Sequence, residues 1–422
     1  MGDNRFKLET DEDALEGQRA SVSLLSLQEL DVSKRELYYE NRHWAYFERL
    51  RREDPVHYHK ESLSGPFWSI TRFADIKAVD ENQRLFSSKL NVTINDQPED
   101  FQLPMFIAMD QPQHDFHRQT VAPIVAPTNL AKLENTIREY SIKILEDIPI
   151  EQTFNWVDRV SIELTAQMLA TLFDVPLNDR YRLKRWSDVA SNGPGSGIVE
   201  SNEQKRKELT DCLDYFSDLF DERKDRPPQF DIISMLAHGD ATKNSPSNEF
   251  LGNILLLIVG GNDTTRNSIS GSVLGLNQYP SEYQKLLNDR ALIPNMVSEI
   301  IRWQTPVPHM RRTAISDTEI RGKAIRAGDK VVIWYISGNR DELIFQEPHA
   351  LRIDRANARQ HVAFGYGIHR CMGNRLAEMQ LRVLWEEILK RFKHIEVVGE
   401  PVRTKSNLIR GYLNLPVVVH PL

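Results

Sequence analysis

Residues 364–373 read FGYGIHRCMG, which puts three glycines and Cys371 in a ten-residue turn just before a helix predicted from about 375 to 393. Glycines let the backbone turn tightly and approach a flat ligand closely. A thiolate here would be stabilised by loop amides, by the positive end of the following helix and by a bound metal. The alternative is a buried structural cysteine, the usual interpretation of a single cysteine. Other motifs in the chain are needed to distinguish a metal-binding thiolate from a structural cysteine.

The spacing F-G-x-G-x-H-x-C-x-G strongly resembles the haem-binding loop of the cytochromes P450, in which the cysteine thiolate is the proximal iron ligand. The resemblance implies a mainly α fold with a small β region, with haem between a long distal helix and the helix after the cysteine loop. It also implies that Cys371 binds the iron of haem b. The matching cofactor-binding positions are Phe364, Gly365, His369 and Gly373. A thiolate ligand donates electron density to iron and favours O–O cleavage over reversible oxygen binding.

The segment 260–265, GGNDTT, interrupts a long and otherwise apolar predicted helix with two helix-weakening glycines and several polar residues. One interpretation is a packing notch between crossing helices. The resemblance instead matches Gly260 and Gly261 to the distal oxygen-binding groove. It matches Asp263 and Thr264 to the acid and the alcohol that deliver protons to dioxygen. Because a buried iron site lacks bulk water, such a relay would be needed.

Glu299 and Arg302 lie three residues apart on one predicted helix face, a spacing suited to a local ion pair. An E-x-x-R pattern alone does not indicate a function. In the family that the chain resembles, this pair joins an arginine of the irregular segment before the cysteine loop, and Arg355 is the matching position. We therefore assign all three residues to the scaffold and not to the chemistry.

Haem carries two propionates, so a buried site needs several cationic or hydrogen-bonding groups along one edge. His114, Arg118, Arg312 and His369 match family positions for this role. Arg311 is the rival to Arg312. For any one of these residues, a solvated surface charge is the simpler interpretation. Their matching offsets from the other motifs favour propionate binding by the set.

Several segments that line the distal pocket in the family are apolar here and have few polar anchors. Plain core packing is the alternative for each residue. The candidate substrate contacts are Leu103, Met105, Phe106, Ile107, Leu256, Val259, Val307, Met310, Leu408 and Ile409. Their composition indicates an apolar small-molecule substrate.

Three stretches resemble the bacterial P450 subfamily that hydroxylates terminal carbons: 255–268, 301–306 and 106–110. That resemblance implies medium-chain n-alkanes or fatty acids as substrates. A primary C–H bond is stronger than the neighbouring secondary one, so positioning of the chain end would set the regiochemistry. The sequence VPH at 307–309 departs from the subfamily, and leaves the preferred chain length open.

Composition narrows the function classes further. The 422 residues are 40% apolar and 27% charged, as in an ordinary globular protein. The net charge of -7 gives no basic field for nucleic acid or an anionic membrane. The two cysteines exclude a disulfide framework and a four-cysteine zinc site, and Cys212 is expected to pack as a small hydrophobe. The longest apolar stretch, 251–261, is about half of the ~20 residues that a membrane span needs. We expect a cytoplasmic monomer without an integral membrane segment.

We expect a loosely ordered leader over 1–35, a first helix near 40–54 and a single haem-thiolate monooxygenase domain over 36–422. A strand near 66–70 and a helix at 73–79 precede a proline-rich loop at 91–112. The glycine-rich break at 193–197 looks like a mobile hinge. Strand-like runs follow at 324–325 and 330–336, and a small β region ends the chain. The main helices are predicted at 114–126, 129–147, 154–173, 178–192, 202–224, 231–238, 248–279, 281–288 and 292–303.

Electrons are expected from a ferredoxin and its NAD(P)H-dependent reductase, since no flavin or nicotinamide domain fits beside this fold. Arg359, Arg370 and Arg375 are candidates for docking an acidic ferredoxin on the cysteine side, although a solvated face or haem support explains each equally well. The alternatives to a ferredoxin-driven hydroxylase are a peroxide-driven hydroxylase and a haem-thiolate sensor without turnover. The Asp263 and Thr264 pair argues against the peroxide user, which needs no proton relay.

Overall fold

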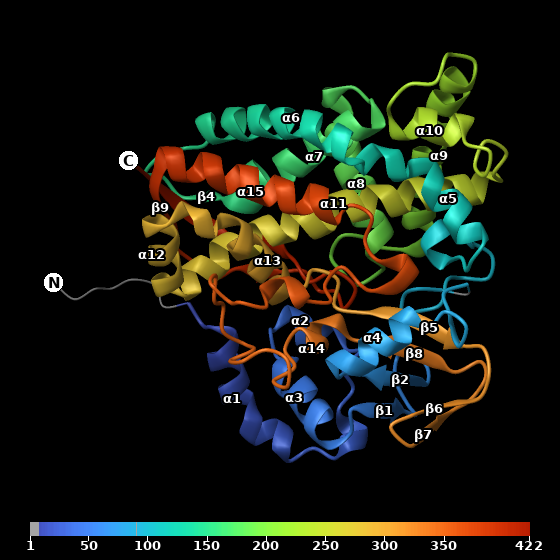
Figure 1. Ribbon diagram of the computed structural model, residues 1–422, viewed down its shortest axis with the longest axis vertical. Helices are drawn as coiled ribbons and strands as arrows, with labels where there is room; N and C mark the ends of the chain where they lie inside the picture. Colours follow the sequence, from blue (N-terminus) through green and yellow to red (C-terminus); the bar gives the residue numbers. More distant parts are fainter. Residues whose placement is uncertain (1–7, 90) are drawn as a thin grey trace.

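The computed structural model describes residues 8–89 and 91–422. Its helices form one large body beside a smaller β-rich region, so the predicted mainly α fold with a small β region is confirmed (Figure 1). The α-helices are α1 Asp11–Ser23, α2 Arg35–Tyr39, α3 Trp44–Glu53, α4 Phe73–Glu81, α5 Gln113–Val121, α6 Pro127–Glu146, α7 Glu163–Phe173, α8 Arg180–Ser191, α9 Asn202–Lys224, α10 Ile232–His238, α11 Ser247–Gln278, α12 Pro280–Asn288, α13 Ile293–Gln304, α14 Tyr335–Gly338 and α15 Asn374–Arg391.

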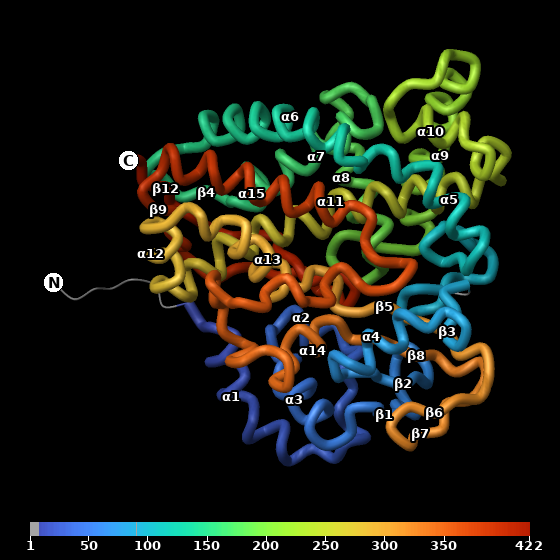
Figure 2. Tube along the Cα trace, in the orientation of Figure 1, coloured from blue at the N-terminus to red at the C-terminus, as the bar shows by residue number. Residues whose placement is uncertain are grey.

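The largest sheet has the strand order β1-β2-β8-β5-β3 and combines early and late parts of the chain, drawn in blue and orange in Figure 2. Its β2 and β8 run parallel, and β5 runs antiparallel to β8. The remaining sheets have the orders β4-β12-β9, β10-β11 and β6-β7. The strands are β1 Val56–His59, β2 Phe67–Ile70, β3 Phe86–Ser87, β4 Phe154–Asn155, β5 Met310–Ala314, β6 Thr318–Ile320, β7 Lys323–Ile325, β8 Lys330–Ile333, β9 Phe392–Val397, β10 Val402–Arg403, β11 Tyr412–Asn414 and β12 Pro416–Pro421.

The predicted helices from 178 to 303 agree with α8 to α13 within two residues at either end. The prediction of one helix over 154–173 is wrong at its start. Phe154–Asn155 pairs with β12 as a strand, and a π-helical turn at Val157–Ile162 precedes α7. The Asn155 side-chain oxygen accepts the backbone N–H groups of Val157 at 3.1 Å and Leu415 at 2.9 Å. This bridge to the carboxyl-terminal strand, which no local pattern reveals, holds the segment in extended form.

The predicted loose leader is wrong where the structure describes it, and residues 1–7 lie outside the described residues. Helix α1 starts with a capping box at Thr10 and buries Ala14 and Leu15. The fully buried Asp11 carboxylate accepts a hydrogen bond from Arg340 at 2.9 Å. The acidic first turn looked like a solvated tail, but its charge is compensated by an arginine far along the chain. The first helix expected near 40–54 is likewise preceded by α2, and α3 spans Trp44–Glu53.

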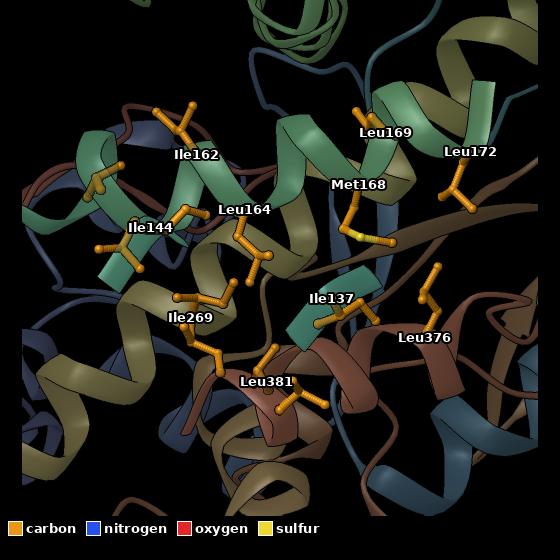
Figure 3. Close-up of a cluster of buried hydrophobic side chains, with 14 of the residues drawn as sticks. Ile137, Ile144, Ile162, Leu164, Met168, Leu169, Leu172, Ile269, Leu376 and Leu381 are labelled. Atoms are coloured by element: carbon orange, nitrogen blue, oxygen red, sulfur yellow. The ribbon is translucent and has the colours of Figure 1, made fainter. Parts of the chain in front are cut away.

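Four helices, α6, α7, α11 and α15, meet in the main core, where their aliphatic side chains face one another (Figure 3). Ile137, Leu164, Ile269 and Leu381 are each at most 1% exposed. Complete burial of such a side chain contributes about 1.5–3 kcal/mol to folding. Cys212 joins this core fully buried, as predicted, and burial raises the pKa of its thiol. The core fixes α11 against α15 and so positions the site between them.

Helix α11 is the longest described helix, yet its second half carries buried polar side chains such as Asn262, Asp263 and Arg266. Across residues 8–89 and 91–422, no helix combines the length and the apolar character needed to cross a bilayer.

Candidate active site

A cavity of about 820 Å³ lies between α11 and the cysteine loop. It is bounded by the 91–108 loop, the segment between α8 and α9, strand β5 and the 405–409 turn. The apolar residues proposed from the sequence as substrate contacts all line it: Leu103, Met105, Phe106, Ile107, Leu256, Val259, Val307, Met310, Leu408 and Ile409. The lining also includes Gly193, Pro194 and Ser196 of the glycine-rich break.

The cysteine loop is shaped by glycines in the left-handed region of backbone space. Gly365 and Gly367 both have φ of +67°, and a Cβ at Gly367 would come within 2.6 Å of the Asp80 carbonyl oxygen. A larger residue at position 367 would therefore be strained and would clash. The Cys371 N–H donates to the Phe364 carbonyl at 2.8 Å, which closes the loop. This local geometry aims the side chain of Cys371 at the cavity.

The Cys371 side chain is exposed to the cavity interior, and protein atoms enclose it on the other sides. Burial raises the pKa of its thiol, and the Gly373 amide, Arg118 and Arg370 act in the opposite direction. Arg118 also lines the cavity and donates to the Arg370 carbonyl at 2.7 Å. The thiol therefore lies in a cationic, amide-rich surrounding of the kind that stabilises a metal-bound thiolate.

Two imidazoles lie beside this loop in the cavity wall. The rings of His114 and His369 are 4.4 Å apart between centroids. Nε2 of His114 and both ring nitrogens of His369 are buried without a hydrogen-bond partner among the described residues. Burial, with some contribution from Arg312, lowers the pKa of His369 to about 2. Buried polar nitrogens of this kind normally have partners, and the edge of an anionic ligand would provide them.

The geometry of strand β5 shows which of the neighbouring residues Arg311 and Arg312 faces the cavity. Arg312 lines the cavity and donates to the buried Asp80 carboxylate at 2.5 Å. Arg311 is not part of the lining, and its guanidinium pairs with Asp96. The alternation of a strand puts neighbouring side chains on opposite faces, so only Arg312 can reach a ligand in the cavity.

These residues fit haem. Apart from its own chain neighbours and helix turn, a Cβ at Gly260 or Gly373 would meet no atom of the described residues within 4 Å, so both glycines leave space in the cavity. A flat macrocycle between them would place Cys371 on one face and Thr264 on the other. The unpartnered ring nitrogens of His114 and His369, together with Arg118 and Arg312, form one polar edge suited to carboxylates.

The predicted acid, Asp263, and the predicted alcohol, Thr264, lie on different faces of α11. Thr264 lines the cavity, and its hydroxyl donates to the Gly260 carbonyl at 2.9 Å. Asp263 is completely buried outside the lining, where its Oδ1 accepts a hydrogen bond from Ser187 at 2.9 Å and lies 3.0 Å from Arg266. Burial raises the pKa of Asp263, and Arg266 opposes this shift. Only the alcohol of this pair faces the cavity.

The scaffold residues Glu299, Arg302 and Arg355 form one buried cluster. Arg302 donates to both Glu299 carboxylate oxygens at 2.7 and 2.8 Å, and Arg355 donates to them at 3.0 and 3.1 Å. Although burial raises the pKa of Glu299, the two arginines hold it below its ordinary value. None of the three lines the cavity.

Sequence reasoning missed other lining residues. Met168 and Leu172 of α7 read as ordinary helix core, and they also face the cavity. Lys205 of α9, with Lys34 and Arg35 near the amino terminus, supplies charge to the lining. In the sequence, Lys205 looks like an ordinary solvated lysine on a polar helix. The one signal that could have singled it out is its position shortly after the glycine-rich break.

A family model described as Cytochrome P450 matches residues 196–416, more than half of the chain. This chain belongs to the cytochrome P450 family. The P450 fold and haem b as its cofactor follow, in agreement with the cavity geometry.

Similar proteins agree with this family. Linalool 8-monooxygenase from Pseudomonas putida is 36% identical over 93% of this chain and 99% of its own length. The methyl-branched lipid omega-hydroxylase of Mycobacterium tuberculosis (strain ATCC 25618 / H37Rv) is 31% identical over 88% of this chain and 90% of its own length. A solved cytochrome P450-153 from Novosphingobium aromaticivorans has 42% identity and a TM-score of 0.86, and covers 93% of this P450 and 99% of that chain. The protein is accordingly a P450 monooxygenase.

Proposed function

We propose that this P450 hydroxylates the terminal carbon of a medium-chain alkane or fatty acid with electrons from a ferredoxin. The observation that carries the proposal is the apolar wall of the cavity, which continues from the 91–108 loop to Thr264 and Cys371. A hydrocarbon chain is the ligand that such a wall accommodates, because polar anchors along it are few. The name of one relative, a lipid omega-hydroxylase, supports oxidation at a chain end.

Terminal attack requires positioning, because the primary C–H bond is the stronger one. Residues from several elements would confine the chain end: Phe106 from the early loop, Leu256 and Val259 from α11, and Val307 before β5. Holding one carbon next to the oxidant and excluding its neighbour is a proximity effect. The apolar wall would therefore determine which carbon reacts.

The chain's own residues would support the chemistry from both sides. When bound, haem supplies the iron centre at which dioxygen is activated, and a thiolate ligand favours that reaction. Cys371 would supply the thiolate that holds the haem iron. His114, Arg118, Arg312 and His369 would hold the propionates. Thr264 would donate a hydrogen bond on the distal side.

Proton supply through Asp263 requires movement of its carboxylate. Its Oδ1 is held by Ser187 and Arg266 away from the cavity, and its Oδ2 has no partner among the described residues. Rotation of this side chain toward Thr264 would connect the alcohol to the polar groups of α8. We propose that Asp263 exchanges protons in this way.

We also propose a ferredoxin and an NAD(P)H-dependent reductase as partners, with the P450 acting as a cytoplasmic monomer. Arg359, Arg370 and Arg375 are exposed. Burial raises the pKa of the nearby Glu378 carboxyl above its ordinary value, and the charges of the three arginines partly oppose this shift. These arginines lie near Glu378 of α15, just after the cysteine loop, and would attract an acidic donor. Charge reversal in Arg359→Glu should slow reduction severalfold at low salt in stopped-flow measurements, and unchanged kinetics would reject this docking surface.

The proposed reaction is tested by supplying a ferredoxin, its reductase and NAD(P)H with dodecane or dodecanoic acid. We expect oxygen at the terminal carbon in most of the product, as identified by gas chromatography and mass spectrometry. Products oxidised mainly inside the chain would refute terminal hydroxylation. Peroxide-driven turnover faster than ferredoxin-driven turnover would instead favour the peroxide-using alternative.

A further inference from the structure

We infer that the substrate of this P450 is a fatty acid, whose carboxylate Lys205 binds at the rim of the cavity. This inference rests on the proposed function and narrows it from an alkane or an acid to the acid. Lys34 and Arg35 belong to the same rim and add positive charge to it. Lys205 is thus proposed as a residue that determines substrate specificity.

Lys205 lies in the first turn of α9 and lines the cavity. Its ammonium group donates to two backbone carbonyls at the end of α8, Ala190 at 3.0 Å and Asn192 at 2.7 Å. An ammonium group has three N–H donors. Two of them are used by these carbonyls, so one is free to bind an oxygen atom in the cavity.

No carboxylate in residues 8–89 or 91–422 pairs with this ammonium group. Among the described residues, no acidic side chain lies within ion-pair distance of Lys205, whereas Lys184 of α8 pairs with Asp188 at 2.7 Å. Burial lowers the pKa of Lys205 to about 8. An enclosed charge without a counterion is unfavourable, and an anionic group of the ligand would relieve this cost.

The acidic residues of the cavity lining are already paired. Glu36 lies 3.1 Å from Lys405, and Asp96 pairs with Arg311 and lies 3.2 Å from Lys330. No other carboxylate belongs to the described lining. Among the described residues, Lys34, Arg35 and Lys205 therefore form no ion pair with an acid of the lining.

Arg35 brings a second cation to the same segment. Its guanidinium donates to the Pro194 carbonyl at 3.2 Å, two residues beyond Asn192, which accepts from Lys205. Lys34 is exposed and has no ion pair among the described residues, so the cavity meets solvent at this rim. An acid entering here with its chain end first would leave its carboxylate among these cations.

The competing explanation is that Lys205 only caps α8. A cation at a helix carboxyl terminus interacts favourably with its dipole and its free carbonyls. A cap stabilises the fold and treats all ligands alike. A lysine that binds the substrate carboxylate instead affects only ligands that carry a negative charge. The experiment therefore compares a charged ligand with an uncharged one.

The test uses the haem-loaded full chain and calorimetric titration with dodecanoate and methyl dodecanoate, which share a chain but differ in charge. Lys205→Gln keeps N–H donors for the α8 carbonyls and removes the charge. Lys205→Arg restores it. Lys207→Gln is the matched control, since Lys207 is exposed on the same helix and lies outside the cavity lining.

We expect the native protein to prefer dodecanoate over the ester, and Lys205→Gln to weaken dodecanoate binding roughly tenfold or more, as for loss of a charge-assisted hydrogen bond. Binding of the ester should be unchanged in that variant. Lys205→Arg should recover most of the affinity, and Lys207→Gln should match the native protein. Equal binding of acid and ester by the native protein, or equal weakening of both in Lys205→Gln, would overturn the inference.

The position of oxidation in dodecanoate separates this inference from the proposed function. If the products are terminal but the acid is not preferred over the ester, carboxylate binding by Lys205 is refuted and terminal hydroxylation is still supported. A preference for the acid that depends on Lys205, combined with products oxidised inside the chain, would support carboxylate binding by Lys205 and refute terminal attack.

Discussion

The cysteine loop and the rim between α8 and α9 border the same cavity but are built differently. Around the loop, Asp80 accepts hydrogen bonds from Arg312, the Tyr335 hydroxyl and the Tyr366 amide at 2.5–2.8 Å, all inside the protein. At the rim, Lys205 donates to the backbone carbonyls of Ala190 and Asn192 at the end of α8, and Arg35 donates to the Pro194 carbonyl of the glycine-rich break. The region around the cysteine loop is thus held by hydrogen bonds to a buried carboxylate, whereas the cations of the rim remain available to bind a ligand.

The largest expected effect is at the loop itself. Replacing the proposed iron ligand in Cys371→His should abolish the red-shifted absorption band of the reduced, carbon monoxide-bound protein, because that band requires thiolate ligation. Hydroxylation of dodecanoic acid should also be lost. Cys212→Ser, which changes the buried cysteine outside the cavity lining, is the control and should keep the band. A band retained in Cys371→His would disprove the ligand assignment.

A second prediction compares a buried carboxylate with an exposed one. Asp80→Asn removes the buried carboxylate that pairs with Arg312 and accepts hydrogen bonds from Tyr335 and Tyr366, and should lower the free energy of unfolding by about 3–5 kcal/mol. Asp96 is 67% exposed, so Asp96→Asn should cost about 0–1 kcal/mol. Denaturant unfolding of the two variants measures both. Equal losses would show that the loop is not the more tightly held region.

A third prediction concerns the distal face of the cavity. Thr264→Ala removes the hydroxyl that lines the cavity and should lower product formed per NAD(P)H consumed by roughly tenfold, the equivalent of one lost hydrogen bond. Thr264→Ser retains the hydroxyl and should remain close to the native yield. Product and cofactor consumption are measured in the same reaction. A native yield in Thr264→Ala would exclude a role for the alcohol.

The smallest expected effect lies at the rim. Arg35 is partly exposed, and its charge acts in contact with solvent, so Arg35→Gln should raise the KM for dodecanoic acid by about two- to fivefold. The kcat should change little, since the residue is remote from the reacting carbon. Arg42→Gln is a matched surface control, because Arg42 pairs with Glu40 outside the cavity lining. A fall in kcat with an unchanged KM would contradict a role in binding.

Local patterns predicted the helices and the cysteine loop well because their causes are local. Apolar spacing produced α8 to α13, and the glycines at 365 and 367 have the positive φ that only a tight turn requires. The same reasoning failed for α1, where the acidic Asp11 is stabilised by Arg340 far along the chain. It also failed at Phe154–Asn155, which depends on pairing with β12.

By itself, the sequence determined that Cys371 closes a glycine turn in front of a helix, and that an apolar cavity would accompany it. These features depend on neighbouring residues and on spacing. Only the tertiary structure decided that Arg312 and not Arg311 faces the cavity, that Asp263 turns toward α8, and that Lys205 reaches the rim. Each of these depends on which distant side chain or carbonyl lies within hydrogen-bond distance, and packing sets that distance.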